Sequence, residues 1–423
     1  MQNILQGFRD KLNINKDLLL LLLIGGLYSL GIFLSNTFVN IYLWRQSGEF
    51  MTIAMYNLAI YLFQAVTFIL AGRLAKKVDR IIVLRLGVTF LSLFFLCVLF
   101  IGEASSTYNF LLGSLLGIGY GFYWLAFNVL TFEITEPDTR DFFNGFLGIL
   151  QSLGGMVGPI VAGIIISRMN GSVGYTTIFT ISFILFILAV ACSFFIQRRK
   201  AEGSFFFKRV LMERNRNKNW RRILYAHVFQ GLREGVFVFV ISIWVFVVTQ
   251  SELALGTFNL FLSGLSAVLY FVVTKFIKPA MRKKAILLGA VLLYLSIFII
   301  LFEVNYTLLM VYAVVIGIAY PIINVPYISL TYDVIGKAWK AGEMRIEYIV
   351  VRELFLNIGR IISVLAFIFL ISIVEPDFAV SIMFVIFGAG HLFVYFYIRN
   401  IYLGSSSKKE ILMKEQITDE KNR

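Results

Sequence analysis

The chain has 423 residues, of which 59% are hydrophobic and 15% are charged, whereas a soluble domain usually has about 25% charged residues. This composition excludes an ordinary soluble domain and predicts an all-α protein that crosses a membrane many times. The net charge of +14 does not indicate nucleic-acid binding, because the Lys and Arg residues occupy short connections between apolar segments rather than one basic face.

Apolar segments long enough to cross a bilayer, roughly 20 residues each, follow one another along the chain. We predict twelve spans: 18–44, 51–73, 81–101, 107–131, 143–167, 175–197, 222–249, 254–277, 283–303, 306–331, 346–373 and 377–398. The first is much longer than the apolar core of a signal peptide, so we interpret it as a spanning helix. Cys97 and Cys192 fall in different spans, and we expect neither a disulfide nor a metal site.

A basic stretch separates six predicted spans from the other six. Residues 198–222 contain ten Lys or Arg and two acidic residues, a composition that cannot cross a bilayer and is retained in the cytoplasm. Phe205, Phe206, Phe207, Val210, Leu211 and Trp220 interleave with the cations. This pattern predicts a helix on an anionic inner leaflet, with its apolar side toward the lipid. The alternative is a solvated tether without a lipid role.

The distribution of Lys and Arg predicts the orientation. In the twelve-span assignment, 33 of the 38 lie in or beside the connections on one side, and only Arg45 and Arg168 lie in those on the other. Positive charge is retained inside, so we expect a plasma-membrane protein with both termini in the cytoplasm. The predicted units are an N-terminal six-helix bundle (1–197), a basic cytoplasmic linker (198–221), a C-terminal six-helix bundle (222–404) and a cytoplasmic tail (405–423).

The two halves of the chain are related in sequence. The tetrapeptide Gly117-Ile118-Gly119-Tyr120 recurs 200 residues later as Gly317-Ile318-Ala319-Tyr320. Arg80 likewise corresponds to Arg282, which lies 202 residues later. Near-constant shifts across several spans indicate a six-helix unit used twice in parallel orientation. Such repeats place a binding site near the bilayer midplane between the halves, and rocking of the halves alternates access to it.

Two motifs carry a resemblance to a known family. The stretch Gly72-Arg73-Leu74-Ala75-Lys76-Lys77-Val78-Asp79-Arg80 resembles the loop motif GxLaDRxGR of the major facilitator superfamily, with Lys76 where the family usually has Asp and Asp79 where it has Gly. In the fifth span, 154–163 resembles the family's antiporter motif GxxxGPxxGG without one glycine of the final pair. In the eleventh span Gly359-Arg360 has Arg in place of Pro, and residues 107–131 lack the Arg of a third family motif.

This resemblance implies a secondary transporter rather than an enzyme, working as a monomer by alternating access and without a cofactor. The antiporter-like motif favours export. The residues to which the resemblance assigns a gating role are Gly72, Arg80, Gly154, Gly158, Pro159 and Gly163. Their alternative role is ordinary close packing of helices, since glycines let neighbouring backbones approach and proline permits a bend.

Ionisable residues inside spans are costly and therefore indicate function. In the seventh span His227, Gln230 and Glu234 share one helical face, while Arg233 lies about 100° from Glu234. In the eleventh span Glu353, Asn357 and Arg360 share a face, and Arg352 precedes them.

We expect Glu234 or Glu353 to take up and release the coupling proton. Arg360 and Arg233 are candidates to hold an anionic group of the substrate, because Arg makes bidentate contacts to such groups. Asn357, His227 and Gln230 are candidates to assist in binding. The alternative is that these residues form static ion pairs that hold the C-terminal half together.

The remaining candidates are uncharged and offer stacking surfaces or amide hydrogen bonds to a solute. In the N-terminal half they are Asn36, Asn40, Tyr120, Tyr123, Trp124, Asn128 and Gln151, and in the tenth span they are Tyr320, Asn324 and Tyr327. Aromatic residues in spanning helices also serve as packing, and we interpret His391 as a packing residue.

Signatures of enzymes and pumps are missing from the sequence, since there is no phosphate-binding GxxxxGK[ST] loop, HExxH or GxSxG. The leading prediction is a proton-coupled transporter of a small or amphipathic solute. The alternatives are a flippase for a lipid-linked anionic molecule and a membrane scaffold or sensor that transports nothing.

Overall fold

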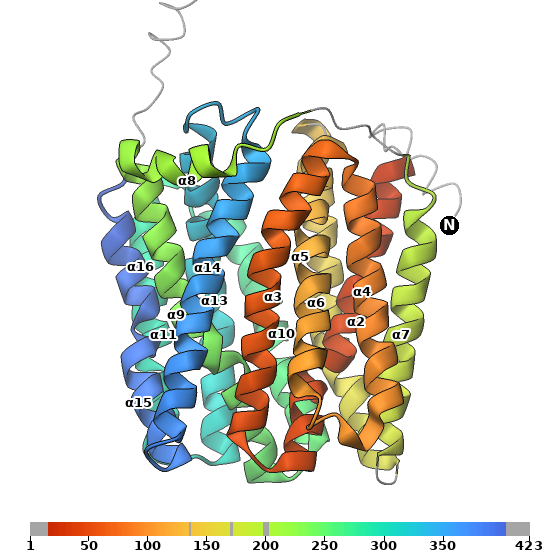
Figure 1. Ribbon diagram of the computed structural model, residues 1–423. Coiled ribbons are helices and arrows are strands. Elements are labelled where there is room, and N and C mark those ends of the chain that lie inside the picture. Colours follow the sequence, from red (N-terminus) through yellow and green to blue (C-terminus); the bar gives the residue numbers. More distant parts are fainter. Residues whose placement is uncertain (1–15, 135–136, 170–171, 198–202, 403–423) are drawn as a thin grey trace, which may run out of the picture.

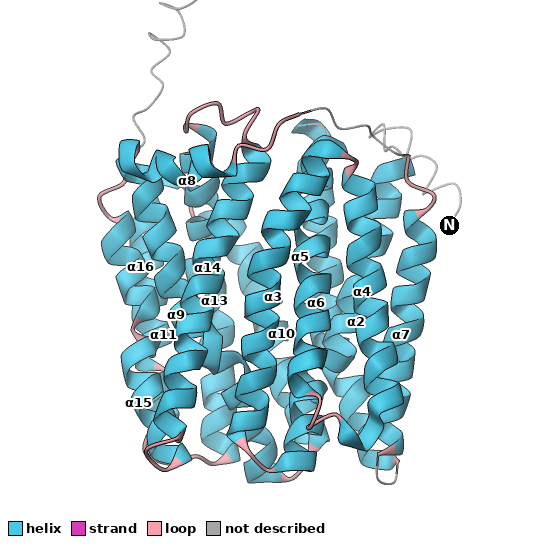
Figure 2. Ribbon diagram, in the orientation of Figure 1, coloured by secondary structure: helices cyan, strands magenta, loops and turns pink. Residues whose placement is uncertain are grey.

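The computed structural model describes residues 16–134, 137–169, 172–197 and 203–402, with side chains throughout except at 132–145. Within these residues all regular elements are helices (Figure 2). The N-terminal half contains α2 (Lys16–Ser47), α3 (Phe50–Lys77), α4 (Arg80–Ile101), the short η1 (Gly102–Ala104), α5 (Asn109–Ile134), α6 (Pro137–Arg168) and α7 (Val173–Ser193).

The second half begins with the short helix α8 (Phe207–Arg216). The remaining elements are α9 (Lys218–Thr249), α10 (Glu252–Phe276), η2 (Pro279–Met281), α11 (Arg282–Leu295), α12 (Ile297–Ile300), α13 (Tyr306–Gly336), α14 (Arg345–Ile371), α15 (Pro376–Gly388) and α16 (Gly390–Ile398). Eleven helical segments of the described chain are long and apolar enough to cross a membrane. The predicted span 283–303 is present as α11 and α12, which are separated at Ser296.

These apolar segments become helices because a backbone in lipid must form its hydrogen bonds internally. Short polar residues then define where several helices begin. The side chain of Asp79 accepts from the Ile81 N–H at 2.8 Å before α4. Asn217 accepts from the N–H of Trp220 at 3.0 Å before α9, and Asn305 accepts from Leu308 at 2.9 Å before α13.

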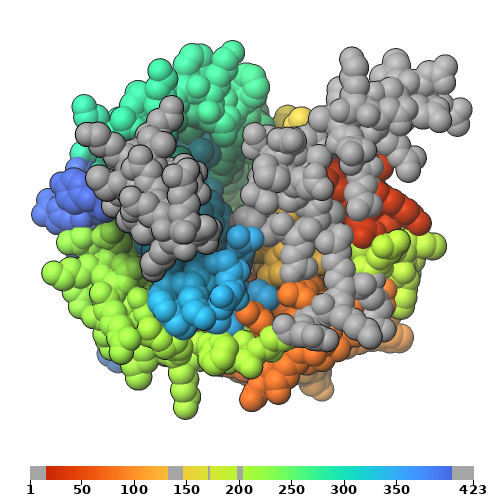
Figure 3. Space-filling model, turned by 90° about the horizontal axis from the view of Figure 1, so that it is seen from above, coloured from red at the N-terminus to blue at the C-terminus, as the bar shows by residue number. Residues whose placement is uncertain are grey.

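The helices form two bundles that lie side by side (Figure 1; Figure 3 shows the same arrangement from above). One bundle contains α2–α7 and the other α9–α16, and they meet chiefly where α3 packs on α14 and α6 packs on α10. The predicted all-α, multi-pass membrane fold is confirmed.

Helix α8 lies across one end of the C-terminal bundle, at the top of Figure 1. We call this end of the molecule the linker end and the other the opposite end. Val210 of α8 is fully buried, and its carbonyl accepts from the Trp220 indole N–H at 3.3 Å. The guanidinium of Arg209 lies 4.4 Å from the ring centre of Trp339. The helix predicted in the basic stretch is therefore present, but part of its apolar side packs on protein instead of facing lipid.

Candidate functional site

A close contact between α9 and α14 brings the ionisable residues together. A Cβ atom on Gly231 would lie 2.1 Å from the Leu356 carbonyl oxygen, and one on Gly359 would lie 2.1 Å from that of Val228. Only glycine permits backbones to come this close. As a result Glu234, one turn after Gly231, reaches the residue that follows Gly359.

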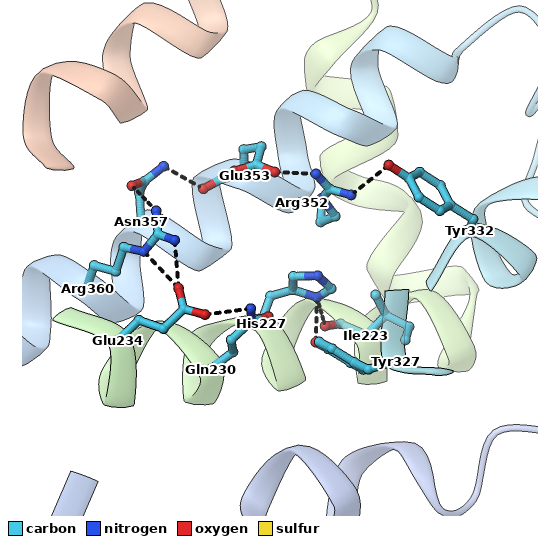
Figure 4. A network of polar contacts seen from close by, with 10 residues as sticks. All are labelled: Ile223, His227, Gln230, Glu234, Tyr327, Tyr332, Arg352, Glu353, Asn357 and Arg360. Atoms are coloured by element: carbon cyan, nitrogen blue, oxygen red, sulfur yellow. Dashed lines mark hydrogen bonds and ion pairs between the residues drawn. The ribbon is translucent and has the colours of Figure 1, made fainter. Parts of the chain in front are cut away.

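That residue is Arg360, and it forms an ion pair with Glu234 (Figure 4). Nη2 and Nε of Arg360 donate to Oε2 of Glu234 at 2.6 and 3.2 Å. The other carboxylate oxygen accepts from the amide of Gln230 at 2.8 Å and from the hydroxyl of Tyr320, on α13, at 3.4 Å. Glu234 is thus held by three helices, and its pairing partner is Arg360 rather than the adjacent Arg233.

A second ion pair lies about two turns of α14 closer to the linker end. Arg352 pairs with its neighbour Glu353 and also donates to the hydroxyl of Tyr332 at 3.5 Å (Figure 4). Asn357 connects the two pairs, because its amide donates to the Glu353 carbonyl at 3.0 Å and its oxygen accepts from Arg360 at 3.5 Å. The stripe predicted on the eleventh span therefore forms one polar network with the stripe on the seventh.

Other predicted site residues of the C-terminal half do not contact the Glu234–Arg360 pair. His227 is buried, and its Nδ1 lies 2.8 Å from both the Ile223 carbonyl oxygen and the hydroxyl of Tyr327. Arg233 is also buried, with its guanidinium 4.8 Å from the ring centre of Phe237. His227, Tyr327 and Arg233 line neither of the two membrane cavities described next, so we leave them out of the proposed binding site.

A central cavity of about 270 Å³ lies between the two bundles and has the Glu234–Arg360 pair in its wall. The N-terminal half contributes mainly aromatic and amide side chains. The lining residues are Tyr28, Asn36, Asn40, Tyr56, Asn57, Ile60, Tyr61, Gln64, Tyr120, Trp124, Glu234, Val238 and Arg360. Four predicted candidates of the N-terminal half, Asn36, Asn40, Tyr120 and Trp124, thus face the ion pair across the cavity.

Tyr61, on α3 of the N-terminal bundle, lies in contact with the Glu234–Arg360 pair. Its ring centre lies 5.5 Å from the guanidinium carbon of Arg360, and its hydroxyl donates to the Gly235 carbonyl at 3.5 Å. Movement of the N-terminal bundle therefore changes the surroundings of Arg360 directly.

Sequence reasoning missed the contribution of α3. Tyr56, Asn57, Tyr61 and Gln64 lie at helical spacing on one face of this helix, and all of them line the cavity. This polar and aromatic stripe in an apolar span was the signal that could have found them. Asn57 also donates to Asn40 of α2 at 3.0 Å, which links two walls of the cavity.

Tyr123 and Asn128 do not line the described cavities. The Tyr123 ring is buried and stacks on Tyr28 with centres 3.9 Å apart, so it packs inside the N-terminal bundle. Asn324 donates to the hydroxyl of Tyr270 at 3.0 Å and lines a second cavity.

The second cavity is a cleft of about 890 Å³ between α6 and α10, which we call the side cleft. It is lined by Phe33, Gly148, Ile149, Gln151, Ser152, Leu153, Gly155, Met156, Leu262, Ser263, Ser266, Ala267, Tyr270, Phe271, Thr274, Tyr320 and Asn324. The hydroxyl of Tyr320, which lines this cleft, donates to Glu234 in the central cavity. Tyr320 therefore stands between the two spaces.

Ion pairs join the two bundles at both ends. At the linker end, Nζ of Lys76 on α3 lies 3.3 Å from Oε1 of Glu347 on α14. At the opposite end, Nη1 of Arg45 on α2 lies 2.7 Å from Oε1 of Glu252 on α10. Lys76 is one of the two residues that depart from the loop motif, and the contact uses a cation on α3 and an acid on α14.

The glycines with a predicted gating role lie where helices approach closely. A Cβ on Gly72 would lie 2.8 Å from Val350 of α14, and one on Gly163 would lie 2.7 Å from the Glu252 carbonyl oxygen of α10. Both are contacts between the bundles. Gly154 and Gly158, which precedes Pro159, instead pack on α2, and Arg80 begins α4 at the linker end.

Two helical bundles around a polar cavity that both line are the arrangement of a secondary transporter. The sequence profile of the Major Facilitator Superfamily matches residues 21–342, and the chain belongs to this family of secondary transporters. The resemblance seen in the motifs is thereby confirmed. Among the described residues, no group of three or more His, Cys, Asp or Glu is arranged to hold a metal ion.

Relatives extend over nearly the whole chain. It is 55% identical over 403 residues to "Uncharacterized protein YqgE" of Bacillus subtilis (strain 168), covering 95% of this chain and 94% of that protein. It is 58% identical over 193 residues to "Uncharacterized protein in sodM 3'region" of Geobacillus stearothermophilus, covering 46% of this chain and 90% of that one.

Solved structures share the fold at low sequence identity. The human organic anion transporter MFSD10 (TETRAN) has a TM-score of 0.67 at 14% identity, over 91% of this chain and all of that chain. An auto-inhibited POT family peptide transporter has a TM-score of 0.74 at 9% identity, over 93% of this chain and 98% of that one.

Proposed function

We propose that this protein is a secondary active transporter of the plasma membrane that moves a small or amphipathic solute by alternating access and couples this movement to protons. The observation that carries the proposal is the Glu234–Arg360 ion pair in the wall of a cavity shared by both bundles. Costly ionisable groups at such a place indicate a substrate or proton pathway.

The pair offers a simple coupling mechanism. With Glu234 ionised, Arg360 is occupied by its carboxylate. When Glu234 takes up a proton, the pair loses its charge attraction and the guanidinium becomes available to an anionic group of the solute. Gln230 and Tyr320 keep the protonated side chain in place through their bonds to Oε1. One proton and one anionic group would then bind together and move in the same direction.

The linker end is the cytoplasmic end in this proposal, because the basic connections gather there. The direction we propose is export, on the strength of the antiporter-like motif in α6. An anion that accumulates in the cell would leave down its own gradient and take a proton with it. An alkaline interior would oppose this efflux, and an acidic interior would favour it.

The test uses Glu234→Gln, which keeps the shape of the side chain but cannot exchange a proton. The full chain is reconstituted in proteoliposomes loaded with octyl sulfonate, an anion that carries no proton of its own at neutral pH. Proton efflux that accompanies the sulfonate must then travel on the protein. Wild type should release sulfonate faster from an acidic interior, whereas E234Q should retain sulfonate counterflow and lose the pH dependence.

Glu303→Gln is the matched control, because it makes the same charge change at an exposed acid in the loop before α13. It should behave like wild type. Equal survival of counterflow and pH-driven flux in E234Q would overturn the coupling role. Absence of flux for anionic, neutral and cationic probes alike would favour the non-transporting scaffold.

A further inference from the structure

The side cleft exists because α6 and α10 touch at one end and separate toward the other. A Cβ on Gly256 would lie 2.6 Å from the Pro159 carbonyl oxygen, and the Gly163 contact to Glu252 is equally tight. Toward the linker end, a Cβ on Gly148 would meet nothing within 4 Å, and one on Gly264 would lie 3.6 Å from the Met156 methyl. The cleft therefore lies in the half of the membrane next to the linker end.

The walls of the cleft combine two kinds of surface. At its rim Ile149, Leu153 and Phe271 are 58%, 48% and 69% exposed, which at membrane depth means contact with lipid chains. Further lining comes from Gln151, Ser152 and Ser263. Within the described part of the chain, these three side chains make no hydrogen bond to protein.

Polar groups without protein partners are expensive inside a membrane, since lipid offers nothing to bond to. Their presence along a cleft whose rim is apolar indicates a ligand with both apolar and polar parts. Seven of the 17 lining residues belong to α10, a helix whose apolar stretch is only 22% buried. The surface of this cleft is therefore accessible within the membrane.

The side cleft is large enough for a ligand and lies next to the Glu234–Arg360 pair. Sites for drug-sized ligands usually measure about 300–1,000 Å³. The central cavity of about 270 Å³ falls below that range, whereas the side cleft of about 890 Å³ falls near its top. Tyr320 lies in the wall of the cleft, and its hydroxyl bonds to the carboxylate that holds Arg360. A long ligand could therefore place its ends in both spaces.

We propose that the side cleft binds the apolar chain of a single-chain amphipathic anion, which enters from the lipid leaflet at the linker end and places its anionic head on Arg360 beside Tyr320. This inference rests on the proposed function and narrows its substrate class. The charge of the site fits an anion, because Arg360 is the cation in the cavity wall and keeps its charge when Glu234 takes up a proton. The apolar rim selects for the chain, and the guanidinium selects for the head.

The experiment maps where the chain of such a ligand lies. The full-length protein in phosphatidylcholine nanodiscs is irradiated with dodecyl sulfonate that carries a diazirine at the end of its chain, and labelled peptides are identified by mass spectrometry. Labelling should occur within 148–156 and 262–274 and should fall strongly when excess unlabelled dodecyl sulfonate is added. Labelling of the lipid-facing Ile184 and Ile187 on α7 should not respond to this competitor.

Variants test separately the binding of the anionic head and of the apolar chain of the ligand. Arg360→Gln should lower the competable labelling about tenfold, and Arg360→Lys should restore part of it. Gly148→Leu fills the cleft at a position with free space and should abolish the competable labelling. Thr180→Phe, on the exposed face of α7, should leave that labelling unchanged. Competable labelling that is unchanged in both Arg360→Gln and Gly148→Leu would overturn the proposal.

A parallel sample contains phosphatidylglycerol with the diazirine in one acyl chain. Competable labelling of the cleft by this lipid, but not by the sulfonate, would overturn the single-chain assignment in favour of a lipid flippase. Labelling that nowhere responds to competitor, or responds only at central residues such as Tyr120, would overturn the cleft site. If proton-linked octyl sulfonate flux persists in that case, the proposed function stands alone. Competable labelling of the cleft without flux would keep the site and remove the function.

Discussion

The two ends of the molecule are joined by ion pairs in different surroundings. At the linker end the side chains of Lys76 and Glu347 are 12% and 0% exposed, whereas at the opposite end those of Arg45 and Glu252 are 49% and 8% exposed. Exposed pairs contribute little to stability, while removing one partner of a buried pair is strongly destabilising. The two ends are therefore not held with equal strength.

The Lys76–Glu347 and Arg45–Glu252 pairs also contact different neighbouring residues. Oε1 of Glu347 accepts from the backbone N–H of Phe206 at 3.2 Å, and a Cβ on Gly72 would lie 2.9 Å from the Phe205 ring. Glu252 instead accepts from the hydroxyl of Tyr175 on α7 at 2.8 Å. The segment between the bundles therefore takes part in the linker-end contact, and its position should change whenever that end opens.

The largest expected effect comes from Glu347→Ala. This change leaves the Lys76 ammonium without its acid partner in a largely buried place and removes the acceptor of the Phe206 N–H. We expect a loss of about 3–5 kcal/mol in unfolding free energy if the contact persists without its acid, measured by denaturation in mixed micelles. If the bundles separate instead, the distance between spin labels on α3 and α14 should increase at the linker end.

A double variant provides the control. Replacing both partners, as Lys76→Met with Glu347→Met, removes the unpaired charge and should recover most of the lost stability. A single variant with wild-type stability and unchanged label distances would show that the two ends are held equally, contrary to the comparison.

Part of this arrangement was predictable from the sequence. The spans follow from local apolar runs, because a helix in lipid forms its backbone hydrogen bonds within itself, and the repeat follows from motifs that recur along the chain. The loop motif drew attention to Lys76, but no local pattern indicates that its partner is Glu347 in the first turn of α14. Such a pairing is a property of how the bundles meet.

The Glu234–Arg360 pair likewise depends on how two helices meet, so no local pattern indicated it. Helical geometry correctly separated Arg233 from Glu234, and it placed Arg360 on an inward stripe. Glu234 and Arg360 are 126 residues apart, and their contact depends on the glycines that let α9 and α14 touch. Gly359 was noted only as part of a motif, so its packing role became visible in three dimensions.

An intermediate effect should come from the contact of α6 with α10, which closes the opposite end next to the Arg45–Glu252 pair. Gly256→Ala would bring a Cβ to 2.6 Å from the Pro159 carbonyl oxygen. We expect a cost of about 1–3 kcal/mol in unfolding free energy, since such overpacking forces the backbones apart.

Gly148→Ala is the matched control on the same pair of helices, because the new methyl group would enter the side cleft without a clash. It should be neutral or stabilise the helix by up to about 1 kcal/mol. Equal destabilisation by both variants, measured by thermal unfolding in detergent, would mean that α6 and α10 are in tight contact along their whole length.

The smallest effect should come from Glu252→Gln at the opposite end. The amide oxygen still accepts from Tyr175, so only the charge attraction to the half-exposed Arg45 is lost. The expected change in unfolding free energy is below about 1 kcal/mol and should shrink further at high salt, which screens exposed pairs. Transport gives a second measurement, because a weaker opposite end should raise the rate at which octyl sulfonate leaves proteoliposomes. A loss of stability as large as that in Glu347→Ala would contradict the asymmetry, since it would require the Arg45–Glu252 pair to be as sheltered from water as its counterpart at the linker end.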